Sequence, residues 1–149
     1  MNAHQKIFSI LRNKFGDQLS HYRIPPPVFA LMSGEFVDFD LEQGILTTRF
    51  PVKDDYLNPY GRMQGGMIAA AVDNTIGPLS ILVAPPNVTR RLEMKYKLPI
   101  KPELEFILVR AIFVERIDPR LFFRAQVLSP EGKILAKAQA THWMIDPIK

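Results

Sequence analysis

The sequence predicts an α+β fold in which one curled antiparallel sheet wraps around a single central helix. Two observations lead to this prediction. A segment in the middle of the chain, MIAAAVDNTIGPLSILV, is apolar on nearly every helical face, and such a helix must be enclosed by the rest of the protein. The segments after it alternate between apolar and polar residues, as strands with one buried face do. A single sheet that curls around one helix satisfies both observations.

The composition is typical of one globular domain. The chain has 149 residues, 47% of them hydrophobic and 23% charged, so we expect one domain over residues 1–149, with residues 1–24 as an N-terminal helical extension. The absence of cysteine excludes disulfides and cysteine nucleophiles, and only three scattered histidines predict no metal site. The net charge of +4 comes from basic residues that are spread out, so we expect no nucleic-acid partner.

We find no pattern of a secretory signal or of a membrane span. The N-terminus lacks an unbroken apolar region followed by small residues. The longest apolar stretch, residues 63–83, is interrupted by Asp73, Asn74 and Pro78. We therefore expect a soluble cytoplasmic protein.

Before the central helix, the pattern predicts one helix and two strands. Apolar residues at helical spacing predict a helix from about Ala3 to Leu19, with Asn2 as its N-cap. Three prolines at 25–27 end any helix and start an extended segment, and strands are expected over residues 28–39 and 44–51. A polar loop then leads to the central helix, which should begin near Gly65 and be kinked by Pro78.

After the central helix, we expect four strands, over residues 88–98, 104–117, 121–128 and 133–145. A hairpin turn at 129–132 joins the last two. In the first of these strands one face is apolar and the other, which includes Thr89, is polar, with the alternation broken only by Arg90. The apolar face carries Val88, Leu92, Met94, Tyr96 and Leu98.

The last predicted strand has a row of small side chains on one face. Ala136, Ala138 and Ala140 form this row and would allow the helix to approach closely. His142 is in register with the alanines, which predicts a hydrogen-bonded residue of the core or its rim. Trp143 falls on the opposite face, where it would pack at the surface or at an interface.

Two glycines, Gly65 and Gly66, stand at the start of the central helix and would allow a ligand to approach the bare backbone. The N–H groups of a first helical turn have no intrahelical partners and carry the positive end of the helix dipole. Such a site favours an anion, or a carbonyl oxygen that becomes one in a transition state. A tight corner from loop to helix explains the same glycines, and the residues alone leave both interpretations open.

Asp73 is an acid in an apolar helix, and it is costly to bury unless it is hydrogen-bonded or functional. Gly65 and Asp73 are eight residues apart, which is about 12 Å along a helix. They therefore cannot contact the same reacting group within one chain. If both act, they come from two chains whose helices run antiparallel across a two-fold axis.

The segment from Asn58 to Asn74 resembles the signature of the hotdog-fold acyl-CoA thioesterases of the PaaI-like group. That signature has an Asn, then His-Gly-Gly six residues later, then an acid nine residues after the His. Here Asn58, the tripeptide that begins at Gln64, and Asp73 stand in the same register. The strand that ends in Tyr96-Lys-Leu-Pro is similar to the Tyr-x-x-Pro strand of that family. The resemblance covers residues 36–143.

The resemblance implies a homodimer, or a dimer of dimers, that hydrolyses an acyl-CoA to a free acid and CoA. It implies no metal and no cofactor besides the coenzyme A of the substrate. Asp73 would be the general base or the nucleophile, and the Gly65 N–H of the other subunit would polarise the thioester carbonyl. Asn58 would hold that carbonyl or the attacking water.

The resemblance extends to Gln64 and Thr89, and three further residues are candidates for the substrate site. Gln64 would contact the thioester or the leaving group, and Thr89 falls where a Ser of some relatives assists the water. Gly66 would line the substrate site. Arg90 and Arg91 are candidates for the phosphates of CoA, since Arg suits phosphate, although solvated or ion-paired arginines would have the same pattern.

Gln64 departs from the family pattern, because His is usual at that position. A Gln can hydrogen-bond but cannot change charge, so a positioning role would survive the change and an acid–base role would not. This departure keeps open a non-catalytic acyl-CoA-binding protein. A hotdog dehydratase or hydratase is a weaker alternative, because such enzymes pair a His with an acid and no His stands near the helix in the sequence.

Overall fold

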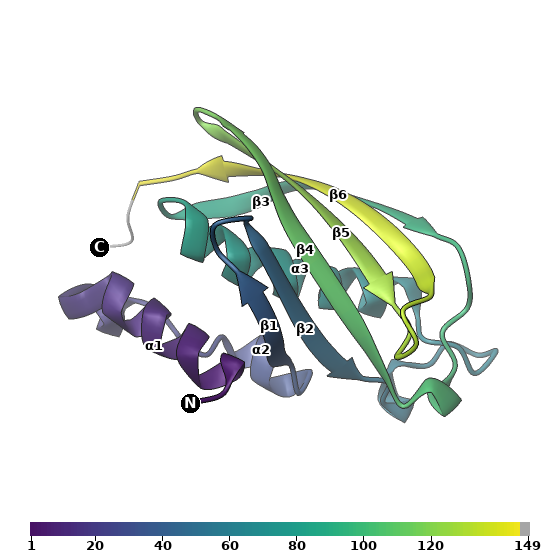
Figure 1. Cartoon of the computed structure of the whole chain (residues 1–149). Helices are drawn as coiled ribbons and strands as arrows, with labels where there is room; N and C mark the ends of the chain where they lie inside the picture. The colour runs from purple at the N-terminus through teal and green to yellow at the C-terminus, as the bar shows by residue number, and fades with distance from the viewer. Residues whose placement is uncertain (147–149) are drawn as a thin grey trace.

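The computed structural model describes residues 1–146, and it shows one curved antiparallel sheet wrapped around a long helix (Figure 1). Residues 147–149 of the expected domain lie outside the described part. The sheet has six strands in the order β1-β2-β4-β5-β6-β3, and each neighbouring pair is antiparallel. The predicted α+β fold is confirmed, including the curled sheet, the central helix and the extra N-terminal helix.

The strands are β1 (Glu35–Asp40), β2 (Ile45–Pro51), β3 (Asn87–Tyr96), β4 (Phe106–Ile117), β5 (Arg120–Leu128) and β6 (Ile134–Met144). The α-helices are α1 (Ala3–Phe15), α2 (Pro27–Leu31) and α3 (Gly65–Val83), and short 3-10 turns lie at Gly16–His21, Asp54–Tyr56 and Pro102–Leu104.

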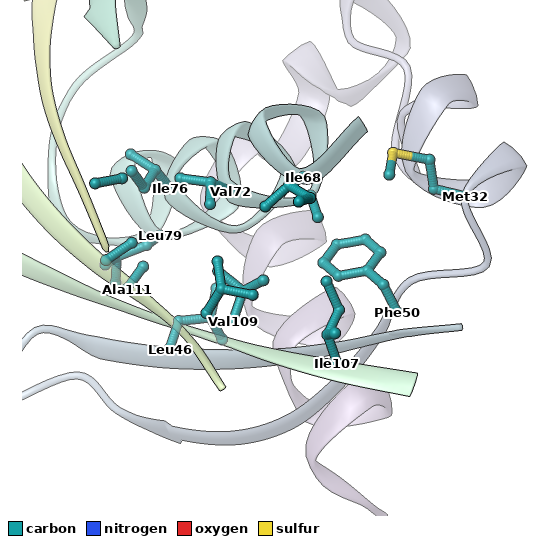
Figure 2. Packing of buried hydrophobic residues seen from close by; sticks show 14 of the residues in the cluster. Met32, Leu46, Phe50, Ile68, Val72, Ile76, Leu79, Ile107, Val109 and Ala111 are labelled. Carbon is teal, nitrogen blue, oxygen red and sulfur yellow. The ribbon is translucent and has the colours of Figure 1, made fainter. Parts of the chain in front are cut away.

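The concave face of the sheet buries α3. Side chains of α3 meet those of β2 and β4 in the core shown in Figure 2, and burial of each large one stabilises the fold by about 1.5–3 kcal/mol. The contacting residues include Ile68, Val72, Ile76 and Leu79 of α3 with Leu46, Phe50, Ile107 and Val109 of the sheet. Of the helices described here, α3 alone is long and apolar enough to cross a membrane. It continues past Pro78 to Val83.

The N-terminal helix α1 begins as predicted, at the N-cap Asn2, whose side chain forms a capping box with Gln5. It ends earlier than Leu19, because Gly16 adopts a φ of 52° and the chain continues as a 3-10 turn. The helix lies beside β1 and α2, at the opposite end of the sheet from β3 (Figure 1). Its Phe8 joins Phe29 and Phe36 in an aromatic cluster.

The predicted strand over residues 28–39 is wrong in its first half. Pro27 begins α2, because the fixed φ of proline suits the first turn of a helix. An N–H at that position would have no acceptor within the helix, so proline loses nothing by lacking one. This short helix inserts Phe29 into the core, where it is 2% exposed. The extended segment begins only at Glu35.

The later strands lie close to their predicted positions. β4 begins at Phe106 instead of residue 104, because Leu104 belongs to a 3-10 turn and Glu105 takes a φ of 67°. The hairpin turn at 129–132 is confirmed, with Gly132 at a φ of 88° and the Ser129 carbonyl accepting its N–H. The alanine row of β6 is buried, and His142 is buried with it.

A β-bulge at Arg90 corrects the predicted faces of β3. Thr89 lies opposite His142 of β6 and Arg91 lies opposite Thr141, so Arg90 is one residue too many for its partner strand. An inserted residue shifts the alternation of side chains by one. Thr89 therefore points to the inner face that Leu92 also occupies, whereas Val88, expected on the buried face, is 43% exposed.

Candidate functional site

The start of α3 presents unpaired backbone donors. Gln64 is the N-cap residue, and its carbonyl accepts hydrogen bonds from the N–H groups of Met67 and Ile68. Its side chain is exposed and does not cap the helix. The N–H groups of Gly65 and Gly66 have no carbonyl one turn earlier in the helix to accept them. This end of the helix can therefore donate to an anion or to a polarised carbonyl oxygen.

Tyr96, at the end of β3, holds the first residue of α3. Its hydroxyl donates a hydrogen bond of 2.7 Å to the Gly65 carbonyl. A Cβ at residue 65 would lie 3.2 Å from the Tyr96 ring and hydroxyl, so the close approach favours glycine. Partial burial raises the pKa of Tyr96, which keeps the hydroxyl protonated as a donor. The sequence pattern placed Tyr96 on the apolar face of its strand and in the family motif, and it did not predict this contact.

Asn58 lies in the loop that leads to α3. Its Oδ1 accepts hydrogen bonds from the N–H groups of Tyr60 (3.0 Å) and Arg62 (3.1 Å). This assignment leaves the Nδ2 group of Asn58 as a donor. A bridge between Leu57 and Met63 folds the loop back on itself, so that Asn58 and the N-cap of α3 belong to one compact turn.

Asp73 and Thr89 are brought together from α3 and β3. Asp73 is half-buried, and its Oδ1 accepts a hydrogen bond of 2.9 Å from Thr89 Oγ1. The bulge at Arg90 makes this contact possible, because it turns Thr89 toward the helix. The sequence paired these two residues only through the family resemblance, and the structure shows them in direct contact.

Two further polar side chains, the buried His142 and the partly exposed Asn87, extend the hydrogen-bond chain beyond Thr89. His142 Nε2 lies 3.3 Å from Thr89 Oγ1, and His142 Nδ1 lies 2.7 Å from Asn87 Oδ1. His142 is 2% exposed, and this burial lowers its pKa, while the charge of Asp73 acts in the opposite direction. The prediction that His142 lies in the core is confirmed, and both of its ring nitrogens face polar atoms. Its link to Asp73 was not predicted, because it depends on the bulge.

Arg90 and Arg91 are both exposed and engaged with neighbouring residues of the sheet. The Arg90 guanidinium lies over the Trp143 ring, 4.8 Å from its centroid, and Arg91 forms an ion pair of 3.1 Å with Glu93. Their predicted contact with CoA phosphates stays a prediction, as does substrate contact by Gly66 and Gln64. Across the described residues 1–146, no cluster of three or more metal-ligating side chains is present.

The site thus consists of two halves on one helix. One half contains Asp73 with Thr89, and the other contains Gly65 with Tyr96 and the Asn58 loop. Eight residues of helix separate Asp73 from Gly65, about 12 Å along the axis. Within one chain, the two halves cannot meet on a single small reacting group.

A curled antiparallel sheet around one long helix is the hotdog fold, and comparison with known proteins agrees. No family model and no curated protein matches the sequence. One similar solved structure is a phenylacetic acid degradation-related protein of Ralstonia eutropha, which is named as a candidate thioesterase. It is 26% identical, with a TM-score of 0.76, and the match covers 93% of this chain and 99% of that one. The PaaI protein of the E. coli phenylacetic acid degradation operon is 11% identical, with a TM-score of 0.76 over 93% and 98%.

A third match is a Streptococcus mutans protein determined with acetyl-CoA bound. It is 24% identical, with a TM-score of 0.70 over 78% of this chain and 91% of that one. The chain is therefore a hotdog-fold protein similar in structure to PaaI-like thioesterases, as the sequence motif predicted.

Proposed function

We propose that this protein is an acyl-CoA thioesterase whose site joins Asp73 of one subunit to the Gly65 end of α3 in another. The observation that carries the proposal is the Thr89–Asp73 hydrogen bond, because it orients a half-buried carboxylate in an otherwise apolar helix. A carboxylate held in this way can act as a general base or as a nucleophile. The acetyl-CoA bound to the Streptococcus mutans protein supports an acyl-CoA ligand.

The reaction follows from these groups. With Asp73 as the base, the water oxygen bonds to the thioester carbon while its proton passes to the carboxylate. The carbonyl oxygen becomes negative and accepts from the Gly65 N–H and from Asn58 Nδ2. The C–S bond then breaks, the CoA thiolate takes up the proton held by Asp73, and the free acid, CoA and the original carboxylate remain. With Asp73 as the nucleophile, its carboxylate oxygen bonds to the thioester carbon and the C–S bond breaks to release the CoA thiolate. Water then hydrolyses the acyl–Asp73 anhydride to the free acid and restores Asp73, and one of the protons of the water passes to the thiolate.

The edge of β3 explains how two subunits could complete the site. β3 lies last in the sheet order, so its outer edge is unpaired within the chain, and apolar Val88 and Leu98 near that edge are 43% and 39% exposed. β3 contacts Asp73 through Thr89 near one end and Gly65 through Tyr96 at the other. Antiparallel pairing of two β3 edges about a two-fold axis would bring the Asp73 half of one subunit to the Gly65 half of the other.

The other groups complete the proposed site. Gln64 at the N-cap would contact the thioester or the leaving group, and Gly66 would line the same end of the helix. Arg90 and Arg91 would meet the CoA phosphates by exchanging their present partners. The dimer, its further pairing into a dimer of dimers, and a cytoplasmic location are parts of this proposal.

A second candidate is a protein that binds acyl-CoA without hydrolysing it. The observation in its favour is Gln64, an exposed amide that cannot change charge at the position where the resembling family has His. In this candidate the helix end and Asn58 would bind the thioester carbonyl, and no water would be activated.

The test is thiol release from short, medium, long and aromatic acyl-CoAs. Asp73→Ala and Asp73→Asn should lower turnover by about 100-fold or more, because an amide or a methyl group cannot accept the proton of water. Glu131→Gln, in the exposed β5–β6 turn, is the matched charge control. Turnover that survives Asp73→Asn would contradict the assigned role. Thermal stabilisation by acyl-CoA without thiol release would favour the binding protein.

A further inference from the structure

The hydrogen-bond chain behind Asp73 fixes which groups carry protons. Asn87 Nδ2 donates to the Pro85 carbonyl at 2.8 Å, so its Oδ1 is the atom that faces His142 Nδ1 at 2.7 Å. A carbonyl oxygen can only accept, and His142 Nδ1 must therefore carry a proton. Burial lowers the pKa of His142, so the ring is neutral near pH 7 and Nε2 is a bare acceptor.

While Asp73 is ionised, the hydrogen-bond chain has one proton too few for its acceptors. Thr89 has a single hydroxyl proton and donates it to Asp73 Oδ1 at 2.9 Å, so it cannot also donate to His142 Nε2 at 3.3 Å. The Nε2 lone pair thus faces a hydroxyl oxygen without receiving its proton. A buried acceptor in that state costs free energy.

Protonation of Asp73 removes this deficit. A neutral carboxyl group is a weaker acceptor than a carboxylate, because charge-assisted hydrogen bonds are about twice as strong as neutral ones. The Thr89 hydroxyl can then turn to His142 Nε2, and the carboxyl O–H can donate to Thr89 Oγ1. His142 Nε2, the acceptor that lacked a proton while Asp73 was ionised, then receives one from Thr89.

We infer that His142 is a positioning residue that acts through Thr89, by accepting the Thr89 hydroxyl once Asp73 has taken the proton of the attacking water. The inference rests on the proposed function, with Asp73 as the general base. In this step no proton leaves the hydrogen-bond chain: Asp73 holds the water proton until the CoA thiolate takes it up, and the Thr89 hydroxyl only changes its acceptor. Because the bond forms as the proton is transferred, it raises kcat and leaves KM nearly unchanged.

The groups around His142 make the hydrogen bond between Thr89 and His142 respond to the charge of Asp73. From α3, the charge that acts on the imidazole is that of Asp73. Thr89 and Asn87 face it from β3, and Leu121 and Phe123 face it from β5, with the Phe123 ring centroid at 4.9 Å. All four of these side chains are uncharged.

A double-mutant cycle tests the inference. His142→Phe, which has no acceptor, should lower kcat about tenfold, the equivalent of one net hydrogen bond, with KM within about twofold. His142→Gln, whose amide oxygen can accept from Thr89, should recover part of that loss. In a Thr89→Val background, His142→Phe should lower kcat no further, since the connection is already cut. Independent, multiplying effects of the two changes would overturn the inference.

Two further measurements separate this inference from protein folding and from the proposed function. The pH profile of kcat should shift between wild type and His142→Gln, which a merely structural histidine would not cause. Nitrogen NMR of the wild-type imidazole, assigned by its loss in His142→Gln, should show the proton on Nδ1 at pH 7. A proton on Nε2 overturns the inference even if no acyl-CoA is hydrolysed. A wild type without thiol release contradicts the proposed function alone.

Discussion

The hydroxyl of Tyr96 donates a 2.7 Å hydrogen bond to the carbonyl of Gly65, and so ties the end of the edge strand β3 to the first residue of α3. At its other end the same strand holds Asp73 of α3 through Thr89. One strand therefore orients both halves of the proposed site. Any change in the position of β3 would alter the proposed base and the proposed oxyanion donors together.

Tyr96→Phe should lower kcat/KM about threefold to tenfold, since the Gly65 peptide loses one hydrogen bond that orients its neighbouring N–H groups. The effect should be on activity more than on folding, because Tyr96 is 50% exposed. Steady-state thiol release and thermal melting of the same samples measure the two. The distant exposed Tyr60→Phe is the control. Equal kinetics for Tyr96→Phe and wild type would show that the hydroxyl does not position the site.

A shared site should restore activity when two inactive variants are mixed. Asp73→Ala removes the base, and Gly65→Val places a side chain against Tyr96 at the oxyanion end. Each variant alone should be inactive. In dimers that contain one chain of each kind, one site combines the intact Asp73 with the intact Gly65, so random mixing should restore about a quarter of wild-type activity. The measurement is thiol release after co-refolding. No recovery, with mixed dimers present by mass spectrometry, would refute the shared site.

The free energy of unfolding should fall as the pH is lowered, partly because of His142. Burial holds the pKa of His142 below its ordinary 6.5, so the unfolded chain binds the proton more readily than the folded chain. The favourable contribution of neutral His142 is complete above about pH 6.5 and is lost as the pH falls from there toward the lowered folded pKa.

The contribution of His142 is measured by urea unfolding between pH 7.5 and 5. His142→Gln should remove the contribution of His142 to the slope of the free energy of unfolding against pH. That contribution is at most about 1.4 kcal/mol per pH unit. Asp73→Asn should steepen the slope, because the opposing charge is gone. The exposed His21→Gln is the control. An unchanged slope in His142→Gln would exclude this explanation.

Lys14→Met should lower the free energy of unfolding by about 1 kcal/mol, since Lys14 Nζ donates to the carbonyls of Ile81 and Ala84 at the end of α3. These carbonyls have no N–H partner within the helix, and a cation there also interacts favourably with the helix dipole. Lys6→Met, which changes an exposed lysine of the same helix α1, is the control. Chemical denaturation of both variants makes the measurement, and equal losses would contradict a specific cap.

Much of the fold could be predicted from local pattern. The apolar run of α3, the capping residue Asn2 and the turn at 129–132 each depend on neighbouring residues, and the structure confirms them. The spacing of Gly65 and Asp73 along one helix likewise places them too far apart for a single-chain site, because the rise of a helix per residue is fixed.

Apart from α2 and the 3-10 turns, the sequence by itself determined the elements and the chemical groups that they carry, and tertiary structure decided which groups meet. Alternation predicts the face of a strand only until a residue is left unpaired. Arg90 breaks the alternation in the sequence, but only the pairing of β3 with β6 shows that it is a bulge and that Thr89 faces inward. Thr89 reaches Asp73, 16 residues away, and His142, 53 residues away, because of that bulge. Contacts at such separations depend on how the sheet closes around α3, which no local pattern records.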